Sequence, residues 1–235
     1  MAHPDVWIVV PAFNEAERIG PTLERIVDYF ERRATPAQVV VVDDGSADAT
    51  AGIAEGFAGR GVRVVRLALN RGKGAALRAG VAATTGEAVL VTDADLSTPI
   101  EELERLEPAL ATAELVLGSR AVAGSRITRR QPWHREWMGR SFNRLIRLLG
   151  VTSLRDTQCG FKLMRGDVAR RLFAELTVDR FAYDVELVWL ARRRGYRVIE
   201  VGVAWHDSPA SKVHAVRDAA SLLVDVLRFR FRHRA

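Results

Sequence analysis

Short valine-rich runs alternate with helix-length stretches through the first half of the chain, and this alternation constrains the fold more than any other feature. The apolar runs are bounded by turn residues and cover residues 6–10, 39–42, 62–67, 88–92 and 115–118. Helix-length stretches lie between and after them, at residues 19–33, 48–58, 74–84 and 100–111. Continuous apolar runs are typical of parallel strands buried on both faces. The pattern therefore predicts a doubly wound α/β fold, a mixed but mostly parallel sheet flanked by helices.

Beyond residue 120 the pattern is looser. Residues 121–132 are polar and read as a loop, and a strand is expected over 198–203. Helices are expected over residues 133–149, 168–175, 183–194 and 213–227, the last of them amphipathic. Residues 228–234 place arginine at every second position, a pattern that fits a strand or an unstructured tail better than a helix. No repeat or linker is visible, so we expect one domain over residues 1–235.

The composition is that of an ordinary globular chain. Its 235 residues, 48% of them hydrophobic, suffice for one sizeable core. The single cysteine, Cys159, excludes a disulfide framework and fits a reducing compartment. The first residues have neither a basic region nor an apolar run, and no stretch approaches the roughly 18 uncharged apolar residues of a membrane span. We therefore expect a cytoplasmic protein without a secretory signal.

Charge is divided unevenly between the two halves of the chain. Residues 1–119 carry 11 lysines and arginines against 18 acidic residues, a net −7, and residues 120–235 carry 24 against 11, a net +13. An acidic half suits a site that recruits cations, whereas a basic half suits phosphate groups or a membrane surface. The alternative is that solvated arginines have collected on exposed helix faces. We expect no nucleic-acid partner.

Polar residues follow three of the expected strands at the point where each strand ends. The sequences are Pro11-Ala12-Phe13-Asn14-Glu15, Asp43-Asp44-Gly45-Ser46 and Asp93-Ala94-Asp95-Leu96-Ser97. Each taken singly has a structural explanation as a helix cap or a turn. Together they place five carboxylates at one edge of a parallel sheet, which is electrostatically costly unless a cation or a hydrogen-bonding ligand is present.

The Asp93-x-Asp95 pair is the sharpest of these signals. Hard carboxylate oxygens beside a short turn suit Mg²⁺ or Mn²⁺, which complete their ligand shell with water and substrate phosphates. A metal held there would stabilise the charge of a departing nucleoside diphosphate. His206 is a candidate third ligand, although a packed or solvated histidine is the more ordinary reading. Cys159 has no evident base partner and reads as a small packed residue.

Several further motifs follow in a fixed order along the chain. They are Val10-Pro11-Ala12-Phe13-Asn14-Glu15, Val41-Val42-Asp43-Asp44-Gly45-Ser46, Asn70-Arg71-Gly72-Lys73-Gly74, Asp93-Ala94-Asp95, Gly118-Ser119-Arg120, Asp156-Thr157-Gln158-Cys159-Gly160-Phe161-Lys162, Phe181-Ala182-Tyr183-Asp184-Val185-Glu186 and Ser211-Lys212. The first four resemble the signature of glycosyltransferase family 2, of the GT-A fold. The later ones resemble the polyprenyl-phosphate sugar synthases, in particular the dolichyl-phosphate β-glucosyltransferase branch. The spacing matches neither a P-loop nor a dinucleotide fingerprint.

The resemblance implies a role for each matching position. Residues 1–119 would bind the nucleotide sugar and metal, and residues 120–235 would bind the acceptor. The nucleotide-sugar residues would be Pro11, Ala12, Asn14, Glu15, Asp43, Asp44, Lys73 and Asp93, with Asp93 and Asp95 as the metal ligands. The acceptor phosphate would meet Arg120, Arg126, Arg129, Arg130 and Lys212. Asp95, Arg120 and Asp156 would act in catalysis, with Asp156 at a position treated in related enzymes as a base. Ser97 stands where these relatives often carry Gln or Gly.

The expected reaction is inverting transfer of a hexose, glucose from UDP-glucose, to a polyprenyl or dolichyl phosphate, with Mg²⁺ or Mn²⁺ as cofactor. One alternative is a family-2 transferase with a hydroxyl acceptor, for which Asp156 or Asp184 must be a true base. Others are a GDP-mannose-using polyprenyl-phosphate mannosyltransferase and a nucleotide-binding regulatory protein without turnover. Because a polyprenyl carrier lies in the bilayer, we expect the basic C-terminal end to reach the cytoplasmic face of a membrane. The alternative is that the apolar stripe of the expected helix over residues 213–227 packs on the core.

Overall fold

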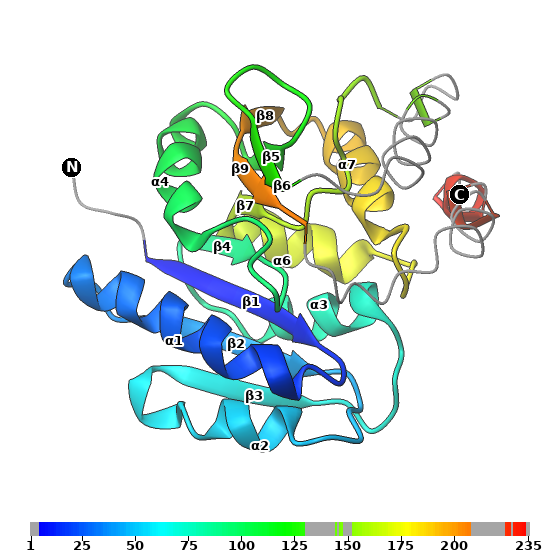
Figure 1. Cartoon of the computed structure of the whole chain (residues 1–235). Coiled ribbons are helices and arrows are strands. Elements are labelled where there is room, and N and C mark those ends of the chain that lie inside the picture. Colours follow the sequence, from blue (N-terminus) through cyan, green and yellow to red (C-terminus); the bar gives the residue numbers. More distant parts are fainter. Residues whose placement is uncertain are drawn as a thin grey trace.

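A seven-stranded sheet forms the centre of the fold. The computed structural model describes residues 5–129, 144, 146, 147, 152–207, 224–226 and 228–233. The strands lie in the order β3-β2-β1-β4-β7-β5-β8 (Figure 1). Their bounds are β1 (Val6–Ala12), β2 (Gln38–Asp43), β3 (Val62–Arg66), β4 (Ala88–Val91), β5 (Leu115–Ser119), β7 (Lys162–Arg165) and β8 (Val198–Gly202). All neighbours are parallel except β7, which is antiparallel to both β4 and β5. The predicted mixed, mostly parallel sheet is confirmed.

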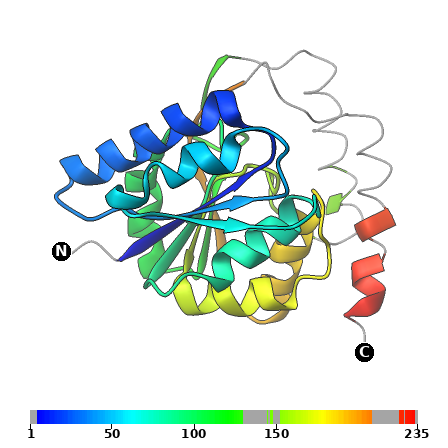
Figure 2. The same cartoon turned by 90° about the horizontal axis from the view of Figure 1, so that it is seen from below.

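Helices cover both faces of this sheet, because successive side chains of a strand point to opposite sides. In β1, Ile8 and Val10 join one apolar cluster, and Trp7 and Val9 join the other. The first cluster includes α1 (Ala16–Arg32), α2 (Thr50–Glu55) and α4 (Leu103–Leu106). The second includes α3 (Lys73–Ala82), α6 (Gly166–Glu175) and α7 (Tyr183–Arg193). Figure 2 shows α1 and α3 on opposite sides of the strands.

Short 3-10 helices interrupt two of the expected helical stretches. The stretch over residues 100–111 is divided into η2 (Ile100–Glu102), α4 and η3 (Glu107–Ala111). After α2, η1 (Ala58–Arg60) leads into β3. The expected helices over 168–175 and 183–194 are confirmed as α6 and α7.

The expected loop over residues 121–132 is wrong for its centre. Strand β6 (Arg126–Arg129) pairs in parallel with β9 (Ala204–His206) in a separate two-stranded sheet. All four β6 side chains are exposed, so the sequence shows no apolar pattern that would reveal the strand. The backbone makes the pairing, with Arg126 N donating to Val203 O at 3.1 Å and Asp207 N donating to Arg129 O at 3.1 Å.

The C-terminal residues are helical, and the expected strand or unstructured tail over 228–234 is wrong. Residues 224–226 and 228–232 are helical wherever they are described. Val226, Phe229 and His233 lie three and four residues apart, which places them on one helical face. Val226 and Phe229 are fully buried, and the Phe229 ring packs 5.5 Å from the ring of Trp189 in α7. Most of the helices expected over 133–149 and 213–227 lies outside the described residues.

The sheet has its topological switch between β1 and β4, because the chain first runs outward to β3 and then returns to the other side of β1. Ligands of doubly wound sheets bind beyond the carboxyl ends of the strands at such a switch. The carboxyl ends of β1, β2, β4 and β5 share this edge. The antiparallel strand β7 starts there, so residues 156–161 before it join the same edge.

Candidate active site

The loops after β1 and β2 are joined by hydrogen bonds between their polar side chains. Asn14 N donates to Ser46 Oγ at 2.8 Å, and Ala47 N donates to Asn14 Oδ1 at 2.9 Å. Asn14 adopts a positive φ of 53°, a conformation that asparagine tolerates better than most residues. The two loops therefore form one rigid rim, with Pro11 and the buried Ala12 at the end of β1 beneath it.

A charged bridge links the β1 loop to the turn after β4. Arg18 in α1 donates to both oxygens of Glu15, at 2.5 and 2.7 Å. Its Nη1 also lies 3.9 Å from Asp95 Oδ2. Arg18 therefore brings two of the predicted site carboxylates, Glu15 and Asp95, to one place.

Asp43, the last residue of β2, and Asp44, the next residue, are both buried. Asp44 accepts hydrogen bonds from Arg71 N at 2.9 Å and Gly72 N at 2.8 Å, one on each carboxylate oxygen. Gly72 has a φ of 107°, and a Cβ there would lie 2.6 Å from the backbone oxygen of Asp179. Asp44 thus holds the turn that leads into Lys73. Asp43 accepts a longer bond, 3.3 Å, from Ser46 N.

Lys73, the first residue of α3, pairs with Asp93 after β4, with Nζ 2.5 Å from Oδ1. Burial alone would raise the pKa of Asp93, but Lys73, Lys162 and Arg120 together lower it. Burial lowers the pKa of Lys73 while Asp93 raises it, and the net shift is upward. Both groups therefore stay charged at neutral pH. Gly160 closes over the carboxylate, since a Cβ there would lie 2.1 Å from Asp93 Oδ2.

The turn that carries Asp95 is fixed by its own backbone. Ser97 N donates to Asp95 Oδ1 at 3.0 Å, and Leu96 adopts a positive φ of 44°. His206 N, at the end of β9, donates to Ser97 O at 2.9 Å. The turn after β4 and the end of β9 are therefore neighbours, although they lie more than a hundred residues apart in sequence.

The carboxylates after β4 have the chemistry of a divalent-metal site. Asp93 and Asp95 are 36% and 19% exposed at their side chains, so both have oxygen surface left for a cation. Among the described residues there is no group of three or more His, Cys, Asp and Glu side chains arranged to hold a metal. Mg²⁺ and Mn²⁺ need only one or two carboxylates when water and phosphate oxygens complete the shell. Asp93 and Asp95 fit that requirement.

Arg120 and Asp156 form a second ion pair at the same edge. Arg120 Nε and Nη2 donate to Asp156 Oδ2 and Oδ1 at 2.7 and 2.9 Å, and Arg120 N donates at 2.9 Å. Burial alone would raise the pKa of Asp156, but the Arg120 guanidinium and its hydrogen bonds lower it. The guanidinium lies 5.3 Å over the ring of Trp205 and keeps 26% of its side chain exposed. Gln158 N also donates to Asp156 Oδ1 at 3.2 Å, so Asp156 is anionic, buried and engaged at both oxygens.

The predicted acceptor arginines of β6 face solvent beside this edge. Arg126 and Arg129 are both exposed, and Arg129 is in register with His206 of β9. Since His206 bonds the turn of Asp95, Arg129 belongs to the same end of the molecule. The predicted Arg130 and Lys212 lie outside the described residues.

Two charged side chains in this region, one buried and one partly buried, were missed by sequence reasoning. Lys162 in β7 is fully buried, pairs with Asp184 of α7, and donates to Cys159 O at 2.6 Å. Its Nζ lies 5.6 Å from the ring centroid of Tyr183. The available signal was a lysine inside the apolar run Phe161-Lys162-Leu163-Met164. Glu200 in β8 is the second and is likewise set in an apolar run.

Comparison with known proteins agrees with this geometry. The family model of glycosyl transferase family 2 matches residues 7–173, which include the loops after β1, β2, β4 and β5. The chain belongs to glycosyltransferase family 2. The resemblance inferred from the motifs is therefore confirmed, and the protein is a glycosyltransferase.

Curated relatives match over most of their length. A dolichyl-phosphate beta-glucosyltransferase of Trichomonas vaginalis is 38% identical over 97% of this chain and 71% of its own. The Homo sapiens protein of that name is 33% identical over 98% of this chain and 78% of its own.

Solved structures share the fold at lower identity. A mannosyltransferase from Pyrobaculum calidifontis, in complex with GDP-Man and Mn²⁺, aligns with a TM-score of 0.65 and 22% identity over 97% of this chain, which spans 65% of that one. Glucosyl-3-phosphoglycerate synthase from Mycobacterium tuberculosis, in complex with Mn²⁺, UDP-glucose and phosphoglyceric acid, aligns with a TM-score of 0.66 and 21% identity. The alignment covers 94% of this chain and 79% of that one. These likenesses confirm the predicted GT-A fold.

Proposed function

We propose that this chain transfers glucose from UDP-glucose to the phosphate of a polyprenyl carrier of the dolichyl type, with inversion at the anomeric carbon. The name shared by the curated relatives supports this acceptor and this sugar. The UDP-glucose and Mn²⁺ named for one structural neighbour support the donor and the cofactor. We assign residues 1–119 to the donor and metal, and residues 120–235 to the acceptor.

The observation that carries the proposal is the state of the two carboxylates available as a base. A hydroxyl acceptor requires Asp156 or Asp184 to remove a proton. Asp156 is 2% exposed and is held by Arg120, and Asp184 is 4% exposed and is held by Lys162. A phosphate monoester has its second pKa near ~6, so its oxygen is already anionic at neutral pH. A phosphate acceptor needs no base, so the pairing of both carboxylates with cations supports a phosphate acceptor.

The reaction then balances without a proton transfer. An oxygen of the acceptor phosphate forms a bond to C1 of glucose, and the bond from C1 to the β-phosphate oxygen of UDP breaks. The bonding electrons leave with UDP. Arg120, Arg126 and Arg129 would bind the acceptor phosphate, because guanidinium groups match phosphate oxygens in charge and geometry. Their work is to orient the attacking oxygen.

On the donor side, the rim formed by residues 11–15 and 43–46 would hold the nucleoside, and Lys73 would lie near the diphosphate. Asp93 and Asp95 would hold Mg²⁺ or Mn²⁺, which would neutralise charge on the leaving diphosphate. The Lys73 pair keeps Asp93 anionic, and Ser97 N orients Asp95. These residues therefore prepare the site before the ion binds.

A lipid acceptor requires contact with a membrane surface. Among the described helices, none is long and apolar enough to cross a bilayer. The C-terminal helix buries Val226 and Phe229 but leaves Phe231 66% exposed among arginines, an arrangement that suits an anionic headgroup layer. We propose that this helix serves both purposes, packing on α7 and touching the cytoplasmic face of the membrane.

The test is a panel of donors and acceptors with purified protein and Mn²⁺. We expect transfer from UDP-glucose to farnesyl phosphate, a short soluble polyprenyl monophosphate, and none to farnesol. GDP-mannose in place of UDP-glucose separates the mannosyltransferase alternative. Transfer to farnesol at the same rate would refute the phosphate acceptor, and nucleotide binding without turnover on any acceptor would indicate a regulatory protein.

A further inference from the structure

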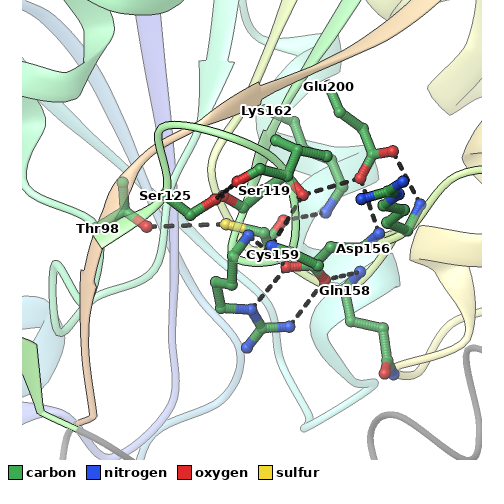
Figure 3. A network of polar contacts seen from close by, with 12 residues as sticks. Thr98, Ser119, Ser125, Asp156, Gln158, Cys159, Lys162 and Glu200 are labelled. Carbon is green, nitrogen blue, oxygen red and sulfur yellow. Dashed lines mark hydrogen bonds and ion pairs between the residues drawn. The ribbon is translucent and has the colours of Figure 1, made fainter. Parts of the chain in front are cut away.

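Glu200 in β8 is a partly buried carboxylate with three hydrogen-bond donors around it. Ser119 Oγ donates to its Oε1 at 2.9 Å, and Asp156 N donates to the same oxygen at 2.8 Å. Arg155 N donates to Oε2 at 2.8 Å. Figure 3 shows Ser119, Asp156 and Glu200 converging on one another.

These donors belong to two segments that are distant in sequence. Ser119 ends β5 and directly precedes Arg120, and its Oγ also accepts Ala121 N at 3.3 Å on the far side of Arg120. The other two donors lie in the loop before β7, whose Asp156 carboxylate holds the Arg120 side chain. Glu200 therefore connects the turn that carries Arg120 with the loop that carries Asp156.

Within the part of the chain that the structure describes, Glu200 is the acceptor that Ser119 Oγ, Arg155 N and Asp156 N share. Without its carboxylate, Arg155 N and Asp156 N would each lose the acceptor that they have among the described residues. Backbone N–H groups left unpaired in a partly buried site shift until water or another oxygen satisfies them. Such a shift moves the Asp156 carboxylate, and Arg120 moves with it because three bonds join the two residues.

We infer that Glu200 is a positioning residue that sets the direction of Arg120 toward the acceptor phosphate. This inference rests on the proposed function, in which Arg120 binds that phosphate. Both oxygens of the Glu200 carboxylate accept hydrogen bonds from the protein itself. It acts through the Ser119 turn and through Asp156, so its loss should weaken use of the acceptor and leave donor binding intact.

The experiment compares Glu200→Gln with Glu114→Gln. Glu114 is a matched control, because it lies at the opposite end of β5 and also accepts a backbone bond, from Arg197 N at 2.8 Å. A glutamine at position 200 keeps one acceptor oxygen but presents an NH₂ to a donor. We expect the KM for farnesyl phosphate to rise about 10-fold in Glu200→Gln, the loss that a 1.4 kcal/mol change produces. The KM for UDP-glucose should stay within about 2-fold, and Glu114→Gln should match the wild type in both constants.

A double-mutant cycle separates positioning from general damage. In an Arg120→Ala background, Glu200→Gln should change the acceptor KM no further, because its effect passes through Arg120. If Glu200→Gln fails to fold by its thermal unfolding profile, Ser119→Ala replaces it in the same cycle, since that variant removes only a hydroxyl.

Equal acceptor KM values in the Glu200 and Glu114 variants, or an additive effect in the Arg120→Ala background, would overturn the inference. For Ser119→Ala, an unchanged acceptor KM would do so as well. These outcomes presuppose wild-type transfer to farnesyl phosphate. A wild type that makes no such product refutes the proposed function instead, so the two failures are distinguishable.

Discussion

Replacing Asp156 by Asn is the change that most sharply separates a positioning carboxylate from a base. Asp156 is 2% exposed and makes three hydrogen bonds to Arg120, two of them from the guanidinium. Removing one partner of a buried ion pair costs about 3–5 kcal/mol. The Arg120 side chain keeps 26% exposure, and water can solvate part of its charge. Asn also keeps one acceptor oxygen, so we expect a loss of about 2–3 kcal/mol of folding stability.

This loss is measurable by calorimetry. With an unfolding entropy of about 2.1 cal/mol/K per residue, a destabilisation of about 2–3 kcal/mol lowers the Tm of a chain of this length by about 4–6 °C. Because the folded-state pKa of Asp156 is lowered, its contribution is complete above the unfolded value of about 3.9 and is lost as the pH falls through the folded value. The difference in stability between wild type and Asp156→Asn should be constant from about pH 5 to 8 and should shrink in acid.

The kinetic result decides the role. A general base contributes about 10²–10⁴-fold to the rate. If Asp156 only orients Arg120, Asp156→Asn should raise the KM for the acceptor phosphate and keep kcat within about 10-fold of wild type. A folded Asp156→Asn protein that binds both substrates but has lost as much kcat as Asp95→Asn would refute this reasoning and support a hydroxyl acceptor.

Three further predictions follow from the site. Asp95→Asn should lose more activity than Asp93→Asn. In calorimetric titration, UDP binding by the Asp95 variant should become insensitive to Mn²⁺. Turnover that Mn²⁺ still stimulates in the Asp95 variant would show that the metal binds elsewhere. The rate should fall below about pH 6, where the acceptor monoester protonates, whereas a rate independent of pH down to about 4.5 would argue against a phosphate nucleophile. Phe231→Asp should reduce flotation with anionic vesicles while the protein remains folded, since Phe231 is 66% exposed. Phe229→Asp should instead unfold the helix, and equal flotation of the wild type and Phe231→Asp would exclude Phe231 from membrane contact.

The strands and the polar residues at their carboxyl ends were predictable from sequence because their signals are local. Valine-rich runs mark β1, β2 and β4, and acidic residues directly after them mark the edge where a parallel sheet collects its ligands. Asp93 and Asp95 need only their own strand to be recognised. The pairing of Asp93 with Lys73 joins two motifs that were each visible alone.

The contacts around Arg120, Asp156 and Lys162 were less predictable because they join residues that are distant in sequence. Strand β7 was missed because Lys162 interrupts its apolar run. In the folded protein this buried lysine is paired with Asp184 of α7. The ion pair of Asp156 with Arg120 could not be predicted, because 36 residues separate the two in sequence. In the C-terminal helix, alternation of arginine and aromatic residues suggested a strand. The contact of Phe229 with Trp189 shows that the helical face with Phe229 packs against the core.

The central claim is that the new bond joins glucose C1 to an oxygen of the acceptor phosphate. Its most direct test is NMR of the product formed from UDP-glucose labelled with ¹³C at C1 and farnesyl phosphate. We predict a phosphodiester ³¹P resonance, a coupling between the labelled C1 and that phosphorus, and the β configuration at the anomeric proton. A labelled C1 without coupling to phosphorus, in free glucose or in a glycoside of a hydroxyl group, would contradict the claim.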